Sequence, residues 1–220
     1  MLTSSLTSDG FSDGFNDGSG VYWEDFDNLD NTNCGLTQFA NNVTGSYSLT
    51  KGLTPSQADP PAGDTSCFLV TPQLREPAPG EVEFDFTSFL TSDIGNMQID
   101  YLGFYWGSID GKSTNMNSLT IYDTNDQIIV TEYGNVITGD EILTLFNGQS
   151  GHQSSKNTNL YVNFDISGLT KFNKFLLKSS GKAFEINNVV ISTSVSEPLS
   201  LILFSFGLFG LAAIRRCKIS

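Results

Sequence analysis

Short apolar segments separated by turn-forming residues constrain the fold of this 220-residue chain more than any other feature. Residues 81–90 alternate between apolar and acidic side chains, the pattern of a half-buried strand. Residues 97–106 are apolar on both faces, which indicates a central strand of a sandwich. The other predicted strands are 21–29, 45–50, 67–71, 118–123, 127–132, 160–166, 172–178 and 183–192. We therefore predict an all-β fold: an antiparallel, jelly-roll-like β-sandwich over residues 21–193.

Three segments depart from the strand pattern. Residues 1–20 repeat Asp-Gly every four residues but lack the spacing and closing Glu of a calcium loop, so they predict a flexible, solvated N-terminal arm. Residues 30–65 are polar and proline-rich, which indicates a long surface loop. Residues 140–146 fit a helical turn or a short strand, and the pattern leaves both open.

The charge of the chain is strongly negative and unevenly placed. Three of the eleven basic residues, Arg215, Arg216 and Lys218, lie near the C-terminus, so residues 1–198 hold eight basic residues against 24 acidic ones. A body of this charge repels nucleic acid and anionic lipid headgroups. We expect no nucleic-acid partner.

The tail predicts a membrane anchor. Residues 199–214 carry no charge and would form a helix of about 24 Å, slightly shorter than the hydrocarbon core of a bilayer. Pro198 suits the first helical position. Because basic flanks stay cytoplasmic, Arg215, Arg216 and Lys218 would act as the membrane stop and leave the β-domain outside.

The three cysteines fit this topology. Cys34 and Cys67 would lie on one side of the membrane and Cys217 on the other. A Cys34–Cys67 disulfide in an oxidising compartment is the resulting hypothesis, and two reduced cysteines packed as small apolar residues are the alternative.

Ser196-Glu197-Pro198, the apolar run and the closing arginines together resemble a PEP-CTERM sorting signal, with Ser196 where proline is usual. Residues 194–220 would form this sorting tail. The resemblance implies recognition by an exosortase, a membrane-embedded cysteine protease or transpeptidase that removes the tail near Glu197-Pro198.

A second resemblance rests on residues 102–108, 119–123 and 183–189. Through these segments the β-domain, over about residues 65–192, is similar to a family of cyanobacterial exosortase-dependent surface proteins. Asn187 stands where the family pattern would have Asp, which weakens any cation-binding role at that position. The resemblance implies export and sorting.

Few residues suggest further chemistry. His152 beside Ser150 and Ser154 could in principle form a Ser-His-Asp arrangement, but the sequence has no nucleophile elbow, and loop polarity explains these residues. Glu185 fits a surface carboxylate better than a structural calcium ligand, and we expect no other cofactor. Tyr105 and Trp106 are either core residues or a sugar-stacking platform.

We accordingly predict a non-enzymatic, exported protein of the cell surface or extracellular matrix, sorted and cleaved by an exosortase. The first alternative is a carbohydrate-binding module acting on exopolysaccharide, and a glycan hydrolase is a distant second. Residues 1–5 do not begin a signal peptide, which predicts that the true start lies upstream of Met1.

Overall fold

The computed structural model describes residues 2–5, 21–27, 33–37, 39–52, 65–87, 97–112, 114–151, 158–166, 172–181 and 183–195. This part of the chain is mostly β-strand. The strands are β1 (Leu2–Ser5), β2 (Val21–Glu24), β3 (Val43–Gly45), β4 (Ser48–Lys51), β5 (Cys67–Thr71), β6 (Gly80–Asp85), β7 (Met97–Gly107), β8 (Asn117–Asp123), β9 (Ile137–Thr138), β10 (Leu160–Asp165), β11 (Phe172–Ser179) and β12 (Phe184–Val195). The all-β prediction is confirmed.

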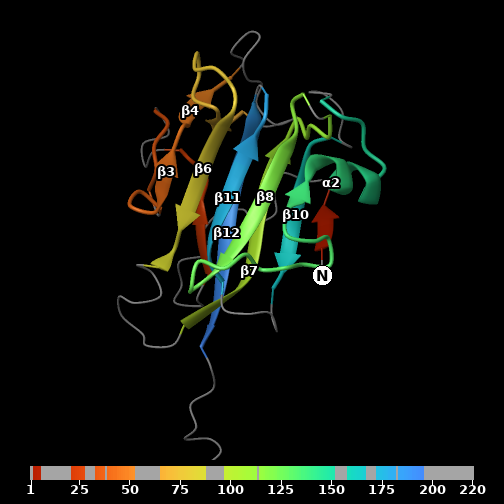
Figure 1. Ribbon diagram of the computed structural model, residues 1–220. Coiled ribbons are helices and arrows are strands. Elements are labelled where there is room, and N and C mark those ends of the chain that lie inside the picture. Colours follow the sequence, from red (N-terminus) through yellow and green to blue (C-terminus); the bar gives the residue numbers. More distant parts are fainter. Residues whose placement is uncertain are drawn as a thin grey trace, which may run out of the picture.

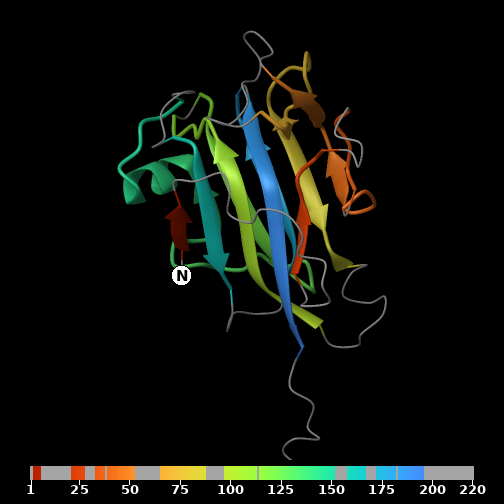
Figure 2. The same cartoon turned by 180° about the vertical axis from the view of Figure 1, so that it is seen from behind.

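The strands form one antiparallel sheet that curls over on itself (Figure 1). Its front layer has the order β3-β6-β11-β8-β9. Its back layer has the order β1-β10-β7-β12, after which β2 and the β5-β4 pair lie along successive lengths of β12. Figure 2 shows this back layer from outside, with β10, β7 and β12 side by side. The two layers are joined where Phe172 of β11 pairs with Ile99 of β7.

The core fills the space between the layers with alternate side chains of their strands. Phe104 of β7 stacks on Phe175 of β11 with ring centroids 6.2 Å apart, and Phe175 stacks on Phe84 of β6 at 4.6 Å. All three rings are fully buried. Such aromatic pairs add directional contacts to the burial of apolar area, so they fix how the layers face each other.

The ambiguous segment after β9 is a helix, α2 (Gly139–Leu145). Thr138 caps it: its hydroxyl accepts from the N–H of Glu141 at 3.3 Å, and the Glu141 carboxylate accepts from the N–H of Thr138 at 2.7 Å. This reciprocal capping box satisfies donors at the helix start. Ile142 and Leu143 then point into the core. The capping pair therefore decides between the helix and the strand.

The predicted strand at 127–132 is wrong. The Asp123 carboxylate accepts from the N–H groups of Asn125 at 2.8 Å and Gln127 at 2.9 Å, which closes a turn after β8. Beyond it, the segment pairs only through isolated bridges. Ile129 is buried, but Ile128 and Val130 on either side of it are 42% and 63% exposed, so a single core contact and two isolated bridges hold the segment instead of a continuous ladder. β8 pairs instead with β9 and β11.

The N-terminal segments also differ from their predictions. Residues 2–5, expected in a solvated arm, form β1 and pair with β10, with Leu2 opposite Phe164. The rest of that arm lies outside the described residues. Within the long loop predicted at 30–65, β4 lies close to the strand predicted at 45–50 and pairs with β5. The same loop contains β3 in addition, which pairs with β6.

The predicted tail lies beyond the described residues, which end at Val195. Among the helices that the structure describes, none is long and apolar enough to cross a bilayer. The helix predicted at 199–214, the motif Ser196-Glu197-Pro198 and the basic residues Arg215, Arg216 and Lys218 therefore stay predictions.

Candidate functional site

The two aromatic residues predicted as a sugar platform lie on opposite faces of β7, and both are buried. The ring of Trp106 points into the core, stacks on Phe184 with centroids 4.6 Å apart, and donates from Nε1 to the side-chain oxygen of Asn117 at 3.5 Å. Tyr105 faces outward but is only 2% exposed. Because a sugar stacks on an accessible ring face, the structure does not support this pair as the platform; Trp106 is a core residue.

A different aromatic cluster covers the outer side of the back layer. It arises because residues 101, 103 and 105 of β7 and residues 161 and 163 of β10 point away from the core, as do alternate residues of β2 and β12. We call it the outer aromatic face, and it consists of Val21, Trp23, Tyr101, Gly103, Tyr105, Tyr161, Asn163 and Val190. Tyr105, Tyr161 and Val190 are buried, whereas Val21, Trp23 and Tyr101 are half-buried at its surface.

Strand register aligns the middle of this face into one row. Asn163 of β10 lies opposite Gly103 of β7, Gly103 opposite Val190 of β12, and Val190 opposite Trp23 of β2. A bulge between Asn187 and Val190 shifts the β12 register and brings Val190 into this row. Four strands at the usual spacing give the row a length of about 14 Å.

Two tyrosine hydroxyls lie over the glycine of this row. A Cβ on Gly103 would meet the Tyr101 hydroxyl directly and would come within 2.8 Å of the Tyr161 hydroxyl. Only glycine therefore leaves room for both groups. The Tyr101 hydroxyl donates to the side-chain oxygen of Asn163 at 2.6 Å. The Tyr161 hydroxyl is buried beside the Tyr101 hydroxyl, and no contact in the described part of the chain meets the geometry of a hydrogen bond to it.

Burial keeps both phenols neutral. It raises the pKa of Tyr101 above its ordinary value, an effect that the adjacent Tyr161 hydroxyl partly offsets. Burial also raises the pKa of Tyr161, and the closeness of Tyr101 raises it further. Both groups can therefore donate and accept hydrogen bonds throughout the physiological pH range.

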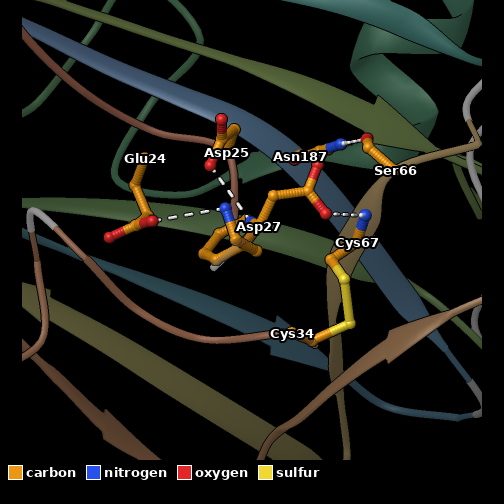
Figure 3. The surroundings of a disulfide bond; sticks show 8 residues. Glu24, Asp25, Asp27, Cys34, Ser66, Cys67 and Asn187 are labelled. Atoms are coloured by element: carbon orange, nitrogen blue, oxygen red, sulfur yellow. Dashed lines mark hydrogen bonds between the residues drawn. A yellow bond between two sulfur atoms is a disulfide. The ribbon is translucent and has the colours of Figure 1, made fainter. Parts of the chain in front are cut away.

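A second cluster, beside the end of β2, contains the disulfide (Figure 3). The structure joins Cys34 to Cys67. Asp27 lies between these two segments: it forms an isolated bridge with Cys34, and its carboxylate accepts from the N–H of Cys67 at 3.1 Å. The bond thus fastens the chain after β2 to the start of β5.

Glu24, at the end of β2, organises the same region from within. It is fully buried, and its carboxylate accepts from the N–H groups of Phe26 at 3.2 Å, Thr37 at 2.7 Å and Phe39 at 3.0 Å. The Thr37 hydroxyl donates to it as well, at 3.1 Å. The carboxylate oxygens therefore accept from N–H and O–H donors, as an anion does in a nest of backbone N–H groups. A carboxylate that binds a cation would direct its oxygens at the cation instead.

The residues considered for calcium do not assemble a metal site. Asn187 donates from its amide to the Ser66 hydroxyl at 2.7 Å (Figure 3). Its side-chain oxygen accepts from the N–H of Asn188 at 2.7 Å. Glu185 is 1% exposed, so it is not the surface carboxylate that the sequence suggested. In the described ranges, no group of three or more His, Cys, Asp or Glu side chains is arranged to hold a metal ion.

Ser150 contacts an aspartate that the sequence did not single out. The Ser150 hydroxyl donates to the Asp110 carboxylate at 3.4 Å and accepts from the N–H of Gly111 at 3.1 Å. Burial raises the pKa of Asp110 to about 6, with the Ser150 hydrogen bond and Lys112 opposing the rise. These contacts tie the loop after α2 to the end of β7. His152 and Ser154 lie outside the described residues.

Sequence reasoning missed Trp23, Tyr101 and Tyr161 as surface candidates. A signal was present in the sequence. Tyr101 and Tyr105 are four residues apart and so lie on the same face of β7, and Tyr161 of β10 lies opposite Tyr105 on that face. The pattern separates the two faces of each strand, but it does not say which face is turned toward the other layer.

The comparisons with known proteins assign no family. No family model and no curated protein matches the chain. One similar solved structure is the enzymatically active domain of tailspike protein 4 of Bacteriophage CBA120, with 16% identity, a TM-score of 0.36 and coverage of 70% of this chain and 19% of that one. Another is the CBM22-1–GH10 part of the Clostridium thermocellum endo-1,4-β-D-xylanase 10B, with 10% identity, a TM-score of 0.36 and coverage of 78% and 28%. The chain thus spans under a third of either structure, and neither likeness is close enough to bear on its function.

Proposed function

We propose that this chain is a non-enzymatic protein of the cell surface or extracellular matrix, exported from the cytoplasm and sorted through its C-terminal tail. The observation that supports this extracellular location is the Cys34–Cys67 disulfide. Disulfides form and persist in oxidising compartments and are rare in the reducing cytosol. Cys67 is a fully buried residue of β5, so the disulfide is part of the domain's core structure. This supports folding of the domain outside the cytoplasm.

The sorting step is proposed from the sequence. The order of Glu197-Pro198, the uncharged run at 199–214 and the basic end fits a transient anchor that an exosortase cleaves. The run would span the membrane as a helix, with the β-domain outside. We further propose that the two layers have jelly-roll connectivity.

The experiment for sorting compares mature masses. The full chain is expressed behind an added signal peptide in a host that has an exosortase, and its intact mass is measured in the cell-surface fraction. Loss of the residues beyond Glu197-Pro198 is expected. Glu197→Ala should retain the tail, and Glu132→Gln, an exposed change in the domain, should be processed normally. Equal masses for Glu197→Ala and the unaltered protein would contradict the sorting proposal.

Carbohydrate binding is the second candidate function. The outer aromatic face favours it, because half-buried Trp23 and Tyr101 present ring surface beside polar groups on an outer sheet face. Aromatic rings combined with a few placed polar groups are the usual lining of a ligand site. Polysaccharide of the matrix around the cell is the partner that this location would offer.

A further inference from the structure

We propose that the outer aromatic face binds a neutral polysaccharide, with the Trp23 ring as the stacking surface and the Tyr161 hydroxyl as a hydrogen-bonding contact. The inference rests on the second candidate function, carbohydrate binding, and specifies its site and ligand class. It replaces Tyr105 and Trp106 as the predicted platform.

The first argument is the hydroxyl of Tyr161. It is on a residue that is 1% exposed, and no contact in the described part of the chain meets the geometry of a hydrogen bond to it, although the Tyr101 hydroxyl lies beside it. The Tyr101 hydroxyl already donates to Asn163. Leaving a buried polar group without a well-formed hydrogen bond is costly, and native proteins rarely do so without a functional reason. Phenylalanine would fill the same space without that cost. A sugar hydroxyl, which both donates and accepts, would satisfy the group once the side chains that cover it moved aside.

The second argument is the arrangement around that hydroxyl. The Tyr101 hydroxyl of β7 donates a 2.6 Å hydrogen bond to Asn163 of β10. This bond fixes the position of the Tyr101 ring before any ligand binds. Gly103 keeps the space beneath the two hydroxyls free of a side chain. Trp23 closes the row on β2, about 14 Å from Asn163 by strand spacing. Gly103 and Val190 in the middle of the row are buried, whereas Asn163 and Trp23 at its ends are half-buried. The separation of these two ends suits contacts with a chain of several sugar units better than contacts with a single sugar.

The third argument is charge, and it selects the class of polysaccharide. Strands β1, β2, β7, β10 and β12, which form this part of the back layer, contain no Lys, Arg or His. They do contain Glu24, Asp100, Asp165 and Glu185. A uronate or sulfated chain would meet no cation on these strands and would be repelled by the acidic protein. A neutral chain needs only stacking and hydroxyl contacts, which this face supplies.

The test is affinity electrophoresis of the full-length chain through gels containing single polysaccharides, in a nonionic detergent without a sugar headgroup. The neutral probes are soluble β-glucan, xylan and galactomannan; alginate is the acidic probe and chitosan the basic one. We expect retardation by at least one neutral probe and none by alginate. Chitosan, a polycation, should retain the acidic protein through its net charge, and Trp23→Ala should leave that retention unchanged. Trp23→Ala should weaken that binding about tenfold or more, as loss of a stacking ring does.

Tyr161→Phe is the decisive variant, because it removes one oxygen and keeps the ring. We expect about fivefold weaker binding and a melting temperature at least as high as that of the unaltered protein. Tyr122→Phe, on β8 of the front layer, is the matched control and should bind normally. Circular dichroism checks that each variant is folded.

The outcomes separate the inference from the function on which it rests. Binding that survives both Trp23→Ala and Tyr161→Phe would overturn the proposed site while leaving carbohydrate binding in place. Retention by alginate, or retention by chitosan that Trp23→Ala abolishes, would overturn the neutral class. Retention by none of the neutral probes, with no effect of Trp23→Ala on the charged ones, would count against carbohydrate binding itself, without affecting the sorting proposal.

Discussion

Glu24 is the acceptor around which Phe26, Thr37 and Phe39 are arranged, and its removal should show what that arrangement contributes. In Glu24→Gln the side chain would turn one NH2 group toward backbone donors that now point at the carboxylate. We expect the free energy of unfolding to fall by about 2–3 kcal/mol, measured by urea denaturation. Glu132→Gln, an exposed carboxylate, should change it by less than about 0.5 kcal/mol. Equal losses in the two variants would contradict the role given to Glu24.

Asp110 should make stability depend on pH. Its pKa is raised to about 6 in the folded protein, from an ordinary value of 3.8. The folded state therefore holds this proton more tightly than the unfolded state, so the stabilisation is complete below pH 4 and is lost as the pH rises through about 6. Asp110→Asn should lack this loss and should be more stable than the unaltered protein at pH 7 by about 1 kcal/mol, because partial exposure screens the effect.

Urea denaturation at pH 4, 5, 6 and 7 checks this prediction through the difference between the two proteins. Subtracting one series from the other removes the contribution of the remaining carboxylates. A difference that is constant across the four pH values would show that Asp110 does not titrate as described.

At the scale of elements, the disulfide should matter because it joins segments that no long ladder holds together. It closes a loop with a sequence separation of 33 residues and connects the chain after β2 to β5. The paired substitution Cys34→Ala and Cys67→Ala should lower the free energy of unfolding by about 3–4 kcal/mol. Dithiothreitol should destabilise the unaltered protein similarly and leave the double variant unchanged. Insensitivity of the unaltered protein to full reduction would contradict this.

The sequence predicts some elements well and others poorly, for physical reasons. β5 has the predicted bounds, and β7, β8, β10 and β11 lie close to theirs, because their side chains alternate or are wholly apolar. β1 could not be predicted: Leu2–Ser5 has one apolar residue, and its pairing depends on the distant edge of β10. The failure at 127–132 has the opposite cause, since apolar Ile128 and Val130 have strand-like composition but no partner surface.

The candidate site was less predictable than the fold. Residues 101–106 are aromatic or apolar on both sides of β7, so periodicity could not tell that Trp106 faces the core and Tyr101 the outside. That distinction depends on which side of β7 the front layer covers. The row from Asn163 to Trp23 depends further on strand order and on the β12 bulge, neither of which leaves a local signal in the sequence.

At the scale of the whole molecule, fold, disulfide and charge fit one location. The described domain is a curled antiparallel sheet with a covalent bond between Cys34 and Cys67, and the chain has a net charge of −13. An acidic domain stays soluble and avoids anionic membrane surfaces. Its disulfide requires an oxidising compartment. These properties are consistent with the proposal that the domain is released on the outer side of the membrane once the predicted anchor is cut.

The most direct test of this proposal is the intact, non-reduced mass of the protein recovered from the surface of cells that produce it naturally. We predict a mature chain that ends near Glu197-Pro198 and shows the mass deficit of one disulfide. Recovery from the cytoplasm instead, with the tail to Ser220 intact and Cys34 and Cys67 as free thiols, would contradict it.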